Sequence, residues 1–254
     1  MNVRSAPAGA QSVLRAVRLL KALSEHGEVD LATLTREVGF ARTTTYRLLA
    51  ALESEDLVTR EPGGVYRLGP GMIQLAMRAG RSDQLRTLAH PHLRTLAADS
   101  GETASLEVLS NGSVLVVDQA FASQLVGVTH EVGISVPLHA TSTGKALLAV
   151  LNPDERAALL PDRLPRLTSE TVTSKRRLDE QLKLAQERGY ATAVDELEVG
   201  FSAVGAAILD AHGRPLAAIS IGGPTGRLNG KARSRAGAAV RDAAAVLSAT
   251  LGYS

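Results

Sequence analysis

The apolar and polar positions of the first 70 residues predict three helices followed by two short strands. Apolar residues recur at helical spacing between residues 12 and 24, and Ser12 is the expected N-cap of this first helix. Its expected buried stripe consists of Val13, Ala16, Val17, Leu20 and Leu23. Asp30 is the expected N-cap of a second helix, Leu31–Val38, and Gly39 and Phe40 form the expected turn after it.

A third predicted helix, Ala41–Leu52, divides into a polar, basic first half and an apolar second half. Its sequence is ARTTTYRLLAAL, and no acidic residue occurs before Glu53 to neutralise Arg42 and Arg47. The residues that form its expected packing face are Thr45, Leu48, Leu49 and Leu52. By itself this segment fits two structures: a recognition helix that contacts DNA, and an amphipathic surface helix with two solvated arginines.

The neighbours of this helix favour DNA binding. A helix, a short helix, a glycine-containing turn and another helix occur in the order of a helix-turn-helix, whose second helix enters the major groove. Two strand-like runs follow, Leu57–Arg60 and Val65–Leu68, on either side of the turn residues 61–64. Because these elements agree with one another, the sequence predicts a winged helix-turn-helix that binds double-stranded DNA.

After the wing, the pattern indicates helices over residues 70–79 and 85–98, which we interpret as a linker. The short polar stretch from Arg81 to Gln84 marks the expected start of the second domain. The predicted organisation is a winged helix-turn-helix domain over 1–69, a helical linker over 70–83 and a second domain over 84–254.

The second domain alternates strand-like and helix-like runs. The predicted strands are Ala104–Leu109, Val114–Gln119, Val126–Glu131, Phe201–Asp210 and Pro215–Gly222. The predicted helices are Gly144–Leu151, Pro153–Leu160, Ser174–Arg188 and Gly230–Leu251, with Asn152 as a cap and Gly189 as a terminator. Strands joined as hairpins with helices between them predict an α+β sheet, not a parallel doubly wound one.

Composition changes this interpretation in few respects. The 254 residues are 44% hydrophobic and carry a formal net charge of +2, which neither requires nor excludes nucleic acid. The sequence has no cysteine, which excludes disulfides, thiolate catalysis and a cysteine zinc site. No apolar run approaches the roughly 20 residues that span a bilayer, and the first ten residues lack a hydrophobic signal core. We therefore expect a cytoplasmic protein without a membrane partner.

Five segments, spread over nearly the whole chain, resemble the IclR family of transcriptional regulators. They are ARTTTYRLLAALESEDL at 41–57, GGVYRLGPGM at 63–72, PLHATSTGKALLAVL at 137–151, RGYATAVDELEVGFSAVGAAILD at 188–210 and AAISIGGPTGRL at 217–228. A winged helix alone occurs in many regulator families. The HATSTGKALLA and RGYA…DELE…G sequences, in this order, are typical of one.

The resemblance implies a DNA-binding regulator, a repressor or an activator, with no enzymatic activity, cofactor or metal. It implies a C-terminal GAF-like α/β domain over 84–254 that binds a small organic effector and mediates oligomerisation. The partners implied are double-stranded operator DNA, the effector and further copies of the chain, as a homodimer or a dimer of dimers. The residues implied to contact DNA are Arg42, Thr43, Thr44, Tyr46, Arg47, Arg60 and Arg67.

The implied effector pocket lies at the loop before the TGKA helix, whose free N–H groups could receive an anion. Similar sensors of small acids carry an Asp, a Cys and paired Ser residues where this chain has Ala193, Ala203, Ser220 and Gly222. We therefore expect a larger or less polar effector than glyoxylate or pyruvate, either an organic acid or an aromatic metabolite. The candidate effector-binding residues are His139, Thr141, Ser142, Thr143, Ala193, Phe201, Ala203 and Ser220.

An alternative function rests on Ser142 and Lys145. Their Ser-x-x-Lys spacing places a potential nucleophile and a lysine one helical turn apart, as in penicillin-binding enzymes. This pattern fits a small-molecule amide or ester hydrolase. No downstream Lys-Thr-Gly or Ser-x-Asn segment accompanies it, so the preferred interpretation is a helix start whose hydroxyls cap the backbone and line a pocket.

Two further groups of residues have both a functional and a structural interpretation. His90 and His92 could bind a metal ion, but the proline between them and the lack of a third ligand favour solvated linker histidines. Asp195, Glu196 and Glu198 could form a catalytic carboxylate group, and a charged strand edge or turn is the preferred interpretation.

Overall fold

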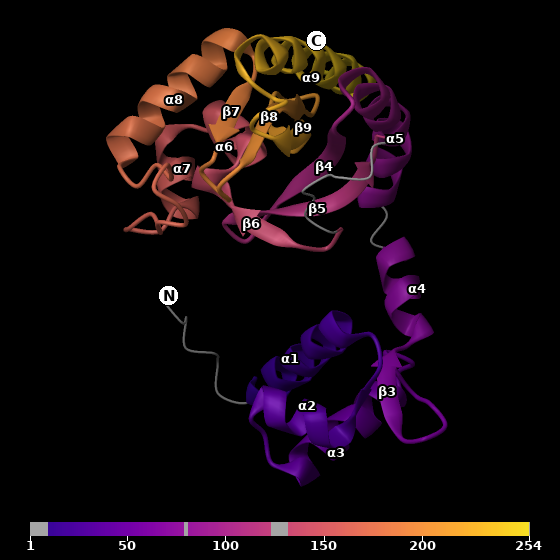
Figure 1. Ribbon diagram of the computed structural model, residues 1–254. Coiled ribbons are helices and arrows are strands. Elements are labelled where there is room, and N and C mark those ends of the chain that lie inside the picture. The colour runs from indigo at the N-terminus through magenta and orange to yellow at the C-terminus, as the bar shows by residue number, and fades with distance from the viewer. Residues whose placement is uncertain (1–9, 79–80, 123–131, 254) are drawn as a thin grey trace. The chain divides into compact units, whose positions relative to one another are not determined.

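The protein is described here by a computed structural model, which covers residues 10–78, 81–122 and 132–253 (Figure 1). Its contacts divide the chain into two compact units, Met1–Asp83 and Gln84–Ser254. One hydrophobic core lies in the first unit, and the sheet of the second unit carries a core on each face. Each unit is therefore stabilised by its own buried residues.

The first unit packs three helices against a three-stranded antiparallel sheet. The helices are α1 (Gln11–His26), α2 (Leu31–Val38) and α3 (Arg42–Glu53), and the strands are β1 (Val29–Asp30), β2 (Val58–Arg60) and β3 (Val65–Leu68). The sheet order is β1-β3-β2. Its core includes Leu19, Leu23, Leu34, Leu49, Val58 and Tyr66. The predicted winged helix-turn-helix is confirmed.

α2 begins and ends at the residues that the sequence predicts. The Asp30 carboxylate accepts hydrogen bonds from the backbone N–H groups of Ala32 and Thr33, at 2.8 and 3.0 Å. These bonds hold the pKa of Asp30 below its ordinary value, with the Thr33 hydroxyl adding a further bond. Gly39 ends the helix in the left-handed conformation, at φ +69°. This cap allows the chain to turn into α3.

The predicted start and buried stripe of α1 are wrong in part. The helix has Ala10 at its N-cap position, with no side-chain cap, so Ser12 lies inside the helix. Val13 and Val17 are 64% and 43% exposed, whereas Leu19, Ala22 and Leu23 are buried. Both sets have helical spacing, and tertiary packing selects between them. The core covers the C-terminal half of α1 and leaves the first turns outside it.

The strand β1 was not predicted from the sequence. Val29 pairs with Tyr66, and Asp30 pairs with Val65, so β1 adds a third strand to the wing hairpin. Two residues are too few for a period-two pattern to appear in the sequence.

Two helices follow the wing, α4 (Pro70–Arg78) and α5 (Arg81–Ser100), and α5 contains Pro91. The interpretation of residues 85–98 as linker is wrong. Leu85, Ala89 and Leu93 are at most 4% exposed and belong to a core of the second unit. α5 is therefore one of the helices that cover the sheet of that unit.

The second unit is built on a six-stranded antiparallel sheet in the order β6-β5-β4-β9-β8-β7 (Figure 1). The strands are β4 (Thr103–Ser110), β5 (Ser113–Ala120), β6 (Ser135–Pro137), β7 (Ala191–Val194), β8 (Phe201–Leu209) and β9 (Pro215–Pro224). The central pair joins β4 to β9, which are far apart in the sequence. The predicted α+β class is confirmed. The short strands β6 and β7 were not predicted, and the predicted strand Val126–Glu131 lies outside the described residues.

Helices cover both faces of this sheet. The remaining helical segments are η1 (Leu138–Ala140), α6 (Ser142–Val150), α7 (Pro153–Leu159), α8 (Lys175–Arg188) and α9 (Gly230–Thr250). α5 and α9 bury one face, and α6 and α8 bury the other. Side chains alternate between the two faces along a strand. On β4, Ala104 and Leu106 therefore point into the core under α5 and α9, and Glu107 points toward α6.

No helix among the described residues is both long and apolar enough to cross a membrane.

Candidate functional site

The beginning of α3 and the wing form a groove on the first unit. The groove is lined by Leu31, Arg42, Thr43, Tyr46, Arg60, Gly64 and Tyr66. Of the residues expected to contact DNA, the structure thus brings Arg42, Thr43, Tyr46 and Arg60 together. Arg47 and Arg67 are exposed and Thr44 is half-buried, and none of these three lines the groove.

The arginines of α3 differ from those of the wing in their partners. Within the described residues, neither Arg42 nor Arg47 makes an ion pair or a side-chain hydrogen bond. Arg60 lies over the Tyr66 ring, 5.9 Å from its centroid. Arg67 donates to a Glu61 carboxylate oxygen at 2.6 Å. The guanidinium groups of α3 are therefore free to bind phosphate or guanine edges, which accept hydrogen bonds from arginine.

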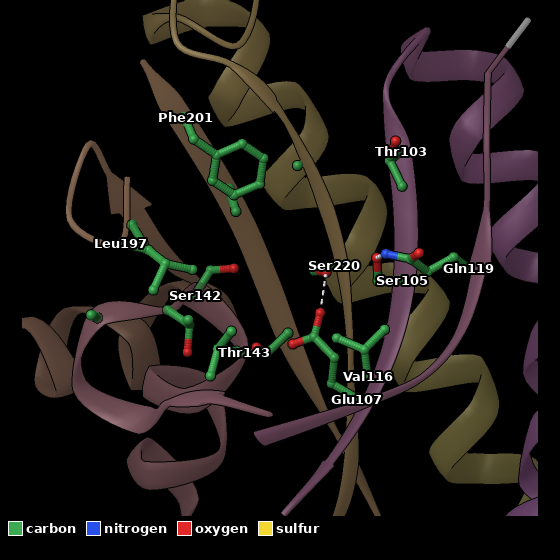
Figure 2. A pocket seen from close by; sticks show the side chains of 16 residues that line it. Thr103, Ser105, Glu107, Val116, Gln119, Ser142, Thr143, Leu197, Phe201 and Ser220 are labelled. Carbon is green, nitrogen blue, oxygen red and sulfur yellow. Dashed lines mark hydrogen bonds between the residues drawn. The ribbon is translucent and has the colours of Figure 1, made fainter. Parts of the chain in front are cut away.

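A pocket opens in the second unit between the beginning of α6 and the α6-facing side of the sheet (Figure 2). It encloses about 570 Å³ of space, its open mouth included. Its described lining consists of Thr103, Ser105, Glu107, Val116, Gln119, Val136, Ala140, Thr141, Ser142, Thr143, Ala193, Leu197, Phe201, Ala203, Ser220 and Gly222. A pocket lined mostly by apolar groups, with a few polar ones among them, is typical of small-molecule sites.

Backbone packing explains why α6 begins at this pocket. Thr141 caps the helix through a hydrogen bond to its side-chain oxygen from the Gly144 N–H, at 3.2 Å. A Cβ atom on Gly144 would overlap the Leu138 carbonyl, so a larger residue there would push η1 away. A Cβ on Gly205 of β8 would lie 3.0 Å from the Thr143 nitrogen. Two glycines therefore let η1, α6 and β8 approach closely.

The floor of the pocket is polar and contains a buried carboxyl group. The Ser220 hydroxyl donates to Glu107 Oε1 at 3.2 Å, and the Gln119 amide donates to the Ser105 hydroxyl at 3.0 Å. Thr143 Oγ1 is buried near the Glu107 carboxyl but completes no hydrogen bond of normal geometry within the described residues. Burial raises the pKa of Glu107 to about 7, although the hydroxyls of Thr143 and Ser220 lower it.

The opposite wall of the pocket is apolar. Ala193, Ala203, Leu197 and Phe201 lie there. A Cβ on Gly222 would lie 2.6 Å from Cζ of the Phe201 ring. The ring thus occupies space that a serine at position 222 would need. The glycine at position 222 and the aromatic ring at position 201 are thus geometrically linked.

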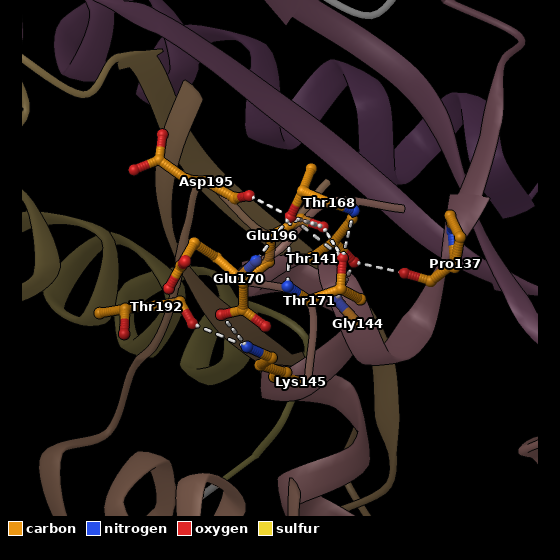
Figure 3. Close-up of polar contacts among 10 residues, drawn as sticks. All are labelled: Pro137, Thr141, Gly144, Lys145, Thr168, Glu170, Thr171, Thr192, Asp195 and Glu196. Carbon is orange, nitrogen blue, oxygen red and sulfur yellow. Dashed lines mark hydrogen bonds and ion pairs between the residues drawn. The ribbon is translucent and has the colours of Figure 1, made fainter. Parts of the chain in front are cut away.

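A buried ion pair joins α6 to the residues around β7 (Figure 3). Lys145 Nζ lies 2.5 Å from Glu196 Oε1 and 3.3 Å from the Thr192 carbonyl oxygen. Burial lowers the pKa of Lys145, and the neighbouring Glu196 carboxylate raises it. The Thr171 hydroxyl donates to the Glu196 carbonyl at 2.6 Å. α6 is thereby connected to the segments that precede and follow β7.

This ion pair corrects the interpretation of Glu196 and weakens that of a hydrolase. The side chain of Glu196 is 7% exposed, so the residue is not part of a charged surface edge. Asp195 is also engaged locally, because its carboxylate accepts from the Gly200 N–H and the Thr225 hydroxyl. The Lys145 ammonium is bonded to the glutamate and a carbonyl, and no hydrogen bond joins it to Ser142 within the described residues.

His139 does not line the pocket, contrary to the expectation from sequence. Its Nε2 lies 2.9 Å from the Pro165 carbonyl oxygen, to which it donates. Burial lowers the pKa of this imidazole, and the bond to Pro165 raises it. The imidazole therefore connects η1 to the segment around Pro165. The other expected effector-binding residues all belong to the lining.

The two histidines of α5 do not form part of a metal site in the described residues, where no group of three metal-ligating side chains occurs. His90 is exposed, as expected for a solvated histidine, and its Nδ1 also lies 2.8 Å from an Asp118 carboxylate oxygen of β5.

Sequence reasoning missed the contribution of β4 and β5 to the pocket. Thr103, Ser105 and Glu107 alternate with apolar residues, which by itself is typical of a strand with one solvated face. The covering of that face by η1 and α6 turns it into a cavity. The alternating pattern was present in the sequence, but whether its polar side faces solvent or a pocket depends on a helix about 40 residues further along the chain.

Comparison with protein families gives two matches. Residues 77–249 match the family described as bacterial transcriptional regulator IclR C-terminal, and residues 12–62 match the IclR helix-turn-helix domain.

Individual relatives agree with these matches. The chain is 38% identical to an HTH-type transcriptional regulator of Mycobacterium tuberculosis over 91% of this chain and 88% of the relative. It is 34% identical to the transcriptional repressor IclR of Escherichia coli, over 95% of this chain and 91% of the relative. A solved structure of an IclR homologue from Microbacterium hydrocarbonoxydans, complexed with 4-hydroxybenzoate, aligns with a TM-score of 0.84 and 26% identity, covering 94% and 98% of the two chains.

Proposed function

This chain belongs to the IclR family of bacterial transcriptional regulators, and we propose which of its residues read the operator and which bind the effector. It is a sequence-specific DNA-binding regulator whose operator binding is modulated by a small organic molecule in the C-terminal domain. The residue assignments below rest on the geometry of the groove and the pocket.

The DNA interface consists of α3 and the wing. α3 enters the major groove with Arg42, Thr43, Thr44, Tyr46 and Arg47 toward the DNA, and Arg60 and Arg67 of the wing contact the backbone. The observation that carries this assignment is that Arg42 and Arg47 are exposed and have no partner in the described part of the chain. Unneutralised arginines at the start of a helix-turn-helix recognition helix are suited to phosphate and guanine.

The effector site is the pocket between α6 and the sheet. Of the two effector classes expected from sequence, the lining favours an aromatic metabolite over an organic acid. The apolar surface comes from Phe201, Val116, Val136 and Leu197. Among the described lining residues, the side chain that can carry a charge is the carboxylic acid of Glu107. The solved homologue from Microbacterium hydrocarbonoxydans is complexed with 4-hydroxybenzoate, which is both aromatic and a carboxylate; it supports the aromatic ring of the proposed ligand and does not argue against an acid.

The chain acts as a homodimer or a dimer of dimers in this proposal. Two recognition helices then contact two half-sites, separated by about one turn of DNA or a multiple of it. The effector shifts the spacing of these helices, with a coupling free energy of about 1–3 kcal/mol between the sites. In this proposal the DNA-binding domain spans residues 1–69, the linker spans 70–83, and the domain for effector binding and oligomerisation spans 84–254.

The test uses the full chain and DNA from the intergenic region next to its own gene. Fluorescence anisotropy should show binding to one short segment that survives competition by unrelated DNA. A metabolite that raises the melting temperature of the protein should also change the affinity for that segment. Equal affinity for all DNA segments, whatever the metabolite, would contradict the proposal.

The hydrolase alternative has less support. A serine nucleophile in this arrangement needs the adjacent lysine as its base. Since Lys145 is bonded to Glu196, we propose that Ser142 serves as a pocket-lining residue and the chain is not an enzyme.

A further inference from the structure

Glu107 is the one lining residue of the described pocket whose side chain can carry a charge near neutral pH. Its side chain lies in the centre of the floor, between Ser220 and Thr143 (Figure 2). The residue is 8% exposed. Neither the family matches nor the acid-sensor pattern of the family assigns a role to a carboxyl group at this position.

The charged groups of the surrounding elements do not neutralise this carboxyl. Lys145 of α6 is paired with Glu196, and Asp118 of β5 with His90. His139 of η1 is bonded to Pro165, and Glu102, which precedes β4, is held by Arg227 at 2.7 and 2.8 Å. On β9, the partner is the neutral Ser220. The free protein therefore keeps a carboxyl in a site that lacks a cation among its described lining residues.

An unpaired buried carboxylate is unfavourable, so in the free protein the group holds a proton over part of the physiological pH range. A cation that enters the pocket removes this penalty, because it pairs with the ionised form. A carboxylate ligand has the opposite effect, since two carboxylates in one low-dielectric site repel each other. The carboxyl group at the floor of the pocket thus favours a ligand with a positive charge, and the apolar wall favours a ligand with a ring.

We propose that the effector is a small aromatic molecule with a basic nitrogen, and that its ammonium group binds the Glu107 carboxylate while its ring lies against Phe201. This inference rests on the proposed function of the pocket as the effector site. Binding is coupled to a proton: the Glu107 carboxylic acid loses its proton to solvent, and the carboxylate then pairs with the ligand cation. No other bond forms or breaks.

Three probes that share one ring test the charge preference: 4-hydroxybenzylamine, 4-hydroxybenzyl alcohol and 4-hydroxybenzoate. Their affinities for the full-length protein are measured by isothermal titration calorimetry at about pH 8, where Glu107 is mostly ionised. We expect the amine to bind about tenfold or more tightly than the alcohol, and the benzoate to bind most weakly. An amine that binds no more tightly than the alcohol overturns the inference.

The variant Glu107→Gln keeps the shape and removes the charge. We expect it to lose the preference for the amine while it retains the alcohol. Ser105→Ala is the matched control, because it removes a polar group of the same strand and should weaken the three probes by a similar factor. An amine preference that survives in Glu107→Gln overturns the inference.

The wild-type protein provides a test that does not depend on whether the variant folds. Titrations of the amine in two buffers of different ionisation enthalpy, at about pH 6, should show the release of nearly one proton, and at about pH 8 much less. A proton release that is absent at both pH values contradicts the pairing.

A separate variant distinguishes a wrong charge inference from a wrong assignment of the pocket as the effector site. Ala203→Leu adds bulk to the wall and should weaken every probe. If it leaves all affinities unchanged, the pocket is not the effector site. If it weakens every probe while the amine shows no preference, the pocket is the site and the charge inference alone is wrong.

Discussion

Lys145 and Glu196 form a buried ion pair of 2.5 Å that joins the first turn of α6 to the segment after β7. Their side chains are 1% and 7% exposed. Glu196 precedes Leu197, and Lys145 follows Ser142 and Thr143; Leu197, Ser142 and Thr143 all line the pocket. The pair therefore connects two segments that contribute lining residues to the pocket of the second unit.

The first prediction concerns the stability of this pair. Lys145→Met leaves Glu196 buried without a cation and should lower the free energy of unfolding by about 3–5 kcal/mol. The double variant Lys145→Met/Glu196→Leu should recover part of this loss, because neither charge remains. Urea unfolding of Lys145→Met, Glu196→Leu, the double variant and the wild type measures the difference. A double variant that is less stable than either single one would contradict this account.

The second prediction concerns Gly222 and Phe201. Gly222→Ala places a methyl group against the ring, so the ring must move, and we expect a loss of about 1–3 kcal/mol from overpacking. In a Phe201→Ala background the same change should cost much less. A double-mutant cycle from thermal unfolding measures the coupling. Equal costs in both backgrounds would show that the two residues do not compete for space.

The third prediction is the pH dependence of stability that Glu107 causes. Its pKa is about 7 in the folded protein and 4.5 in an exposed chain, so the folded state binds more protons between these values. Stability therefore declines as the pH rises from about 4.5 to 7, by an amount of the order of 3 kcal/mol.

Glu107→Gln should remove this decline. The variant should then be more stable than the wild type above pH 7, and the difference in stability between the two proteins should be smaller at pH 5. Chemical unfolding at several pH values measures it. Parallel curves for the two proteins would show that Glu107 is not the titrating group.

The fourth prediction concerns the recognition helix. Arg47→Ala should weaken operator binding by about 1–3 kcal/mol and leave effector binding and the melting temperature unchanged, because the side chain is exposed and has no partner in the described residues. Arg177→Ala, an exposed arginine on α8, is the matched control for the loss of one positive charge. If both variants lose the same affinity, the loss of net charge alone would explain the effect.

The fifth prediction separates the regulator from a hydrolase. An acylating probe, followed by mass spectrometry of the intact protein, should leave Ser142 unlabelled under conditions in which the protein binds its operator. The reason is that Lys145, bonded to Glu196, cannot take the proton of the serine. Stoichiometric labelling at Ser142 that is lost in Ser142→Ala would support the hydrolase instead.

Local sequence patterns were sufficient for elements with their own start and stop signals. Asp30 and Gly39 determine the bounds of α2, and Asn152 and Glu155 form the capping box of α7. The hairpin of β4 and β5 follows from its Asn-Gly turn. The helix order and the wing likewise sufficed for a winged helix-turn-helix, since each signal lies within a few residues of the structure that it specifies.

The tertiary structure decided which faces are covered. Val13 and Leu19 both lie on apolar stripes of α1, but packing against α2 and α3 buries Leu19 alone. The sequence predicted Glu196 to be a surface charge, whereas in the folded protein it is buried and paired with Lys145 of α6. Glu107 lies on a strand whose alternation suits a solvated face, and α6, which follows after more than 30 residues, closes that face into a pocket. Burial and pairing depend on residues distant in sequence, so they arise only when the chain has folded.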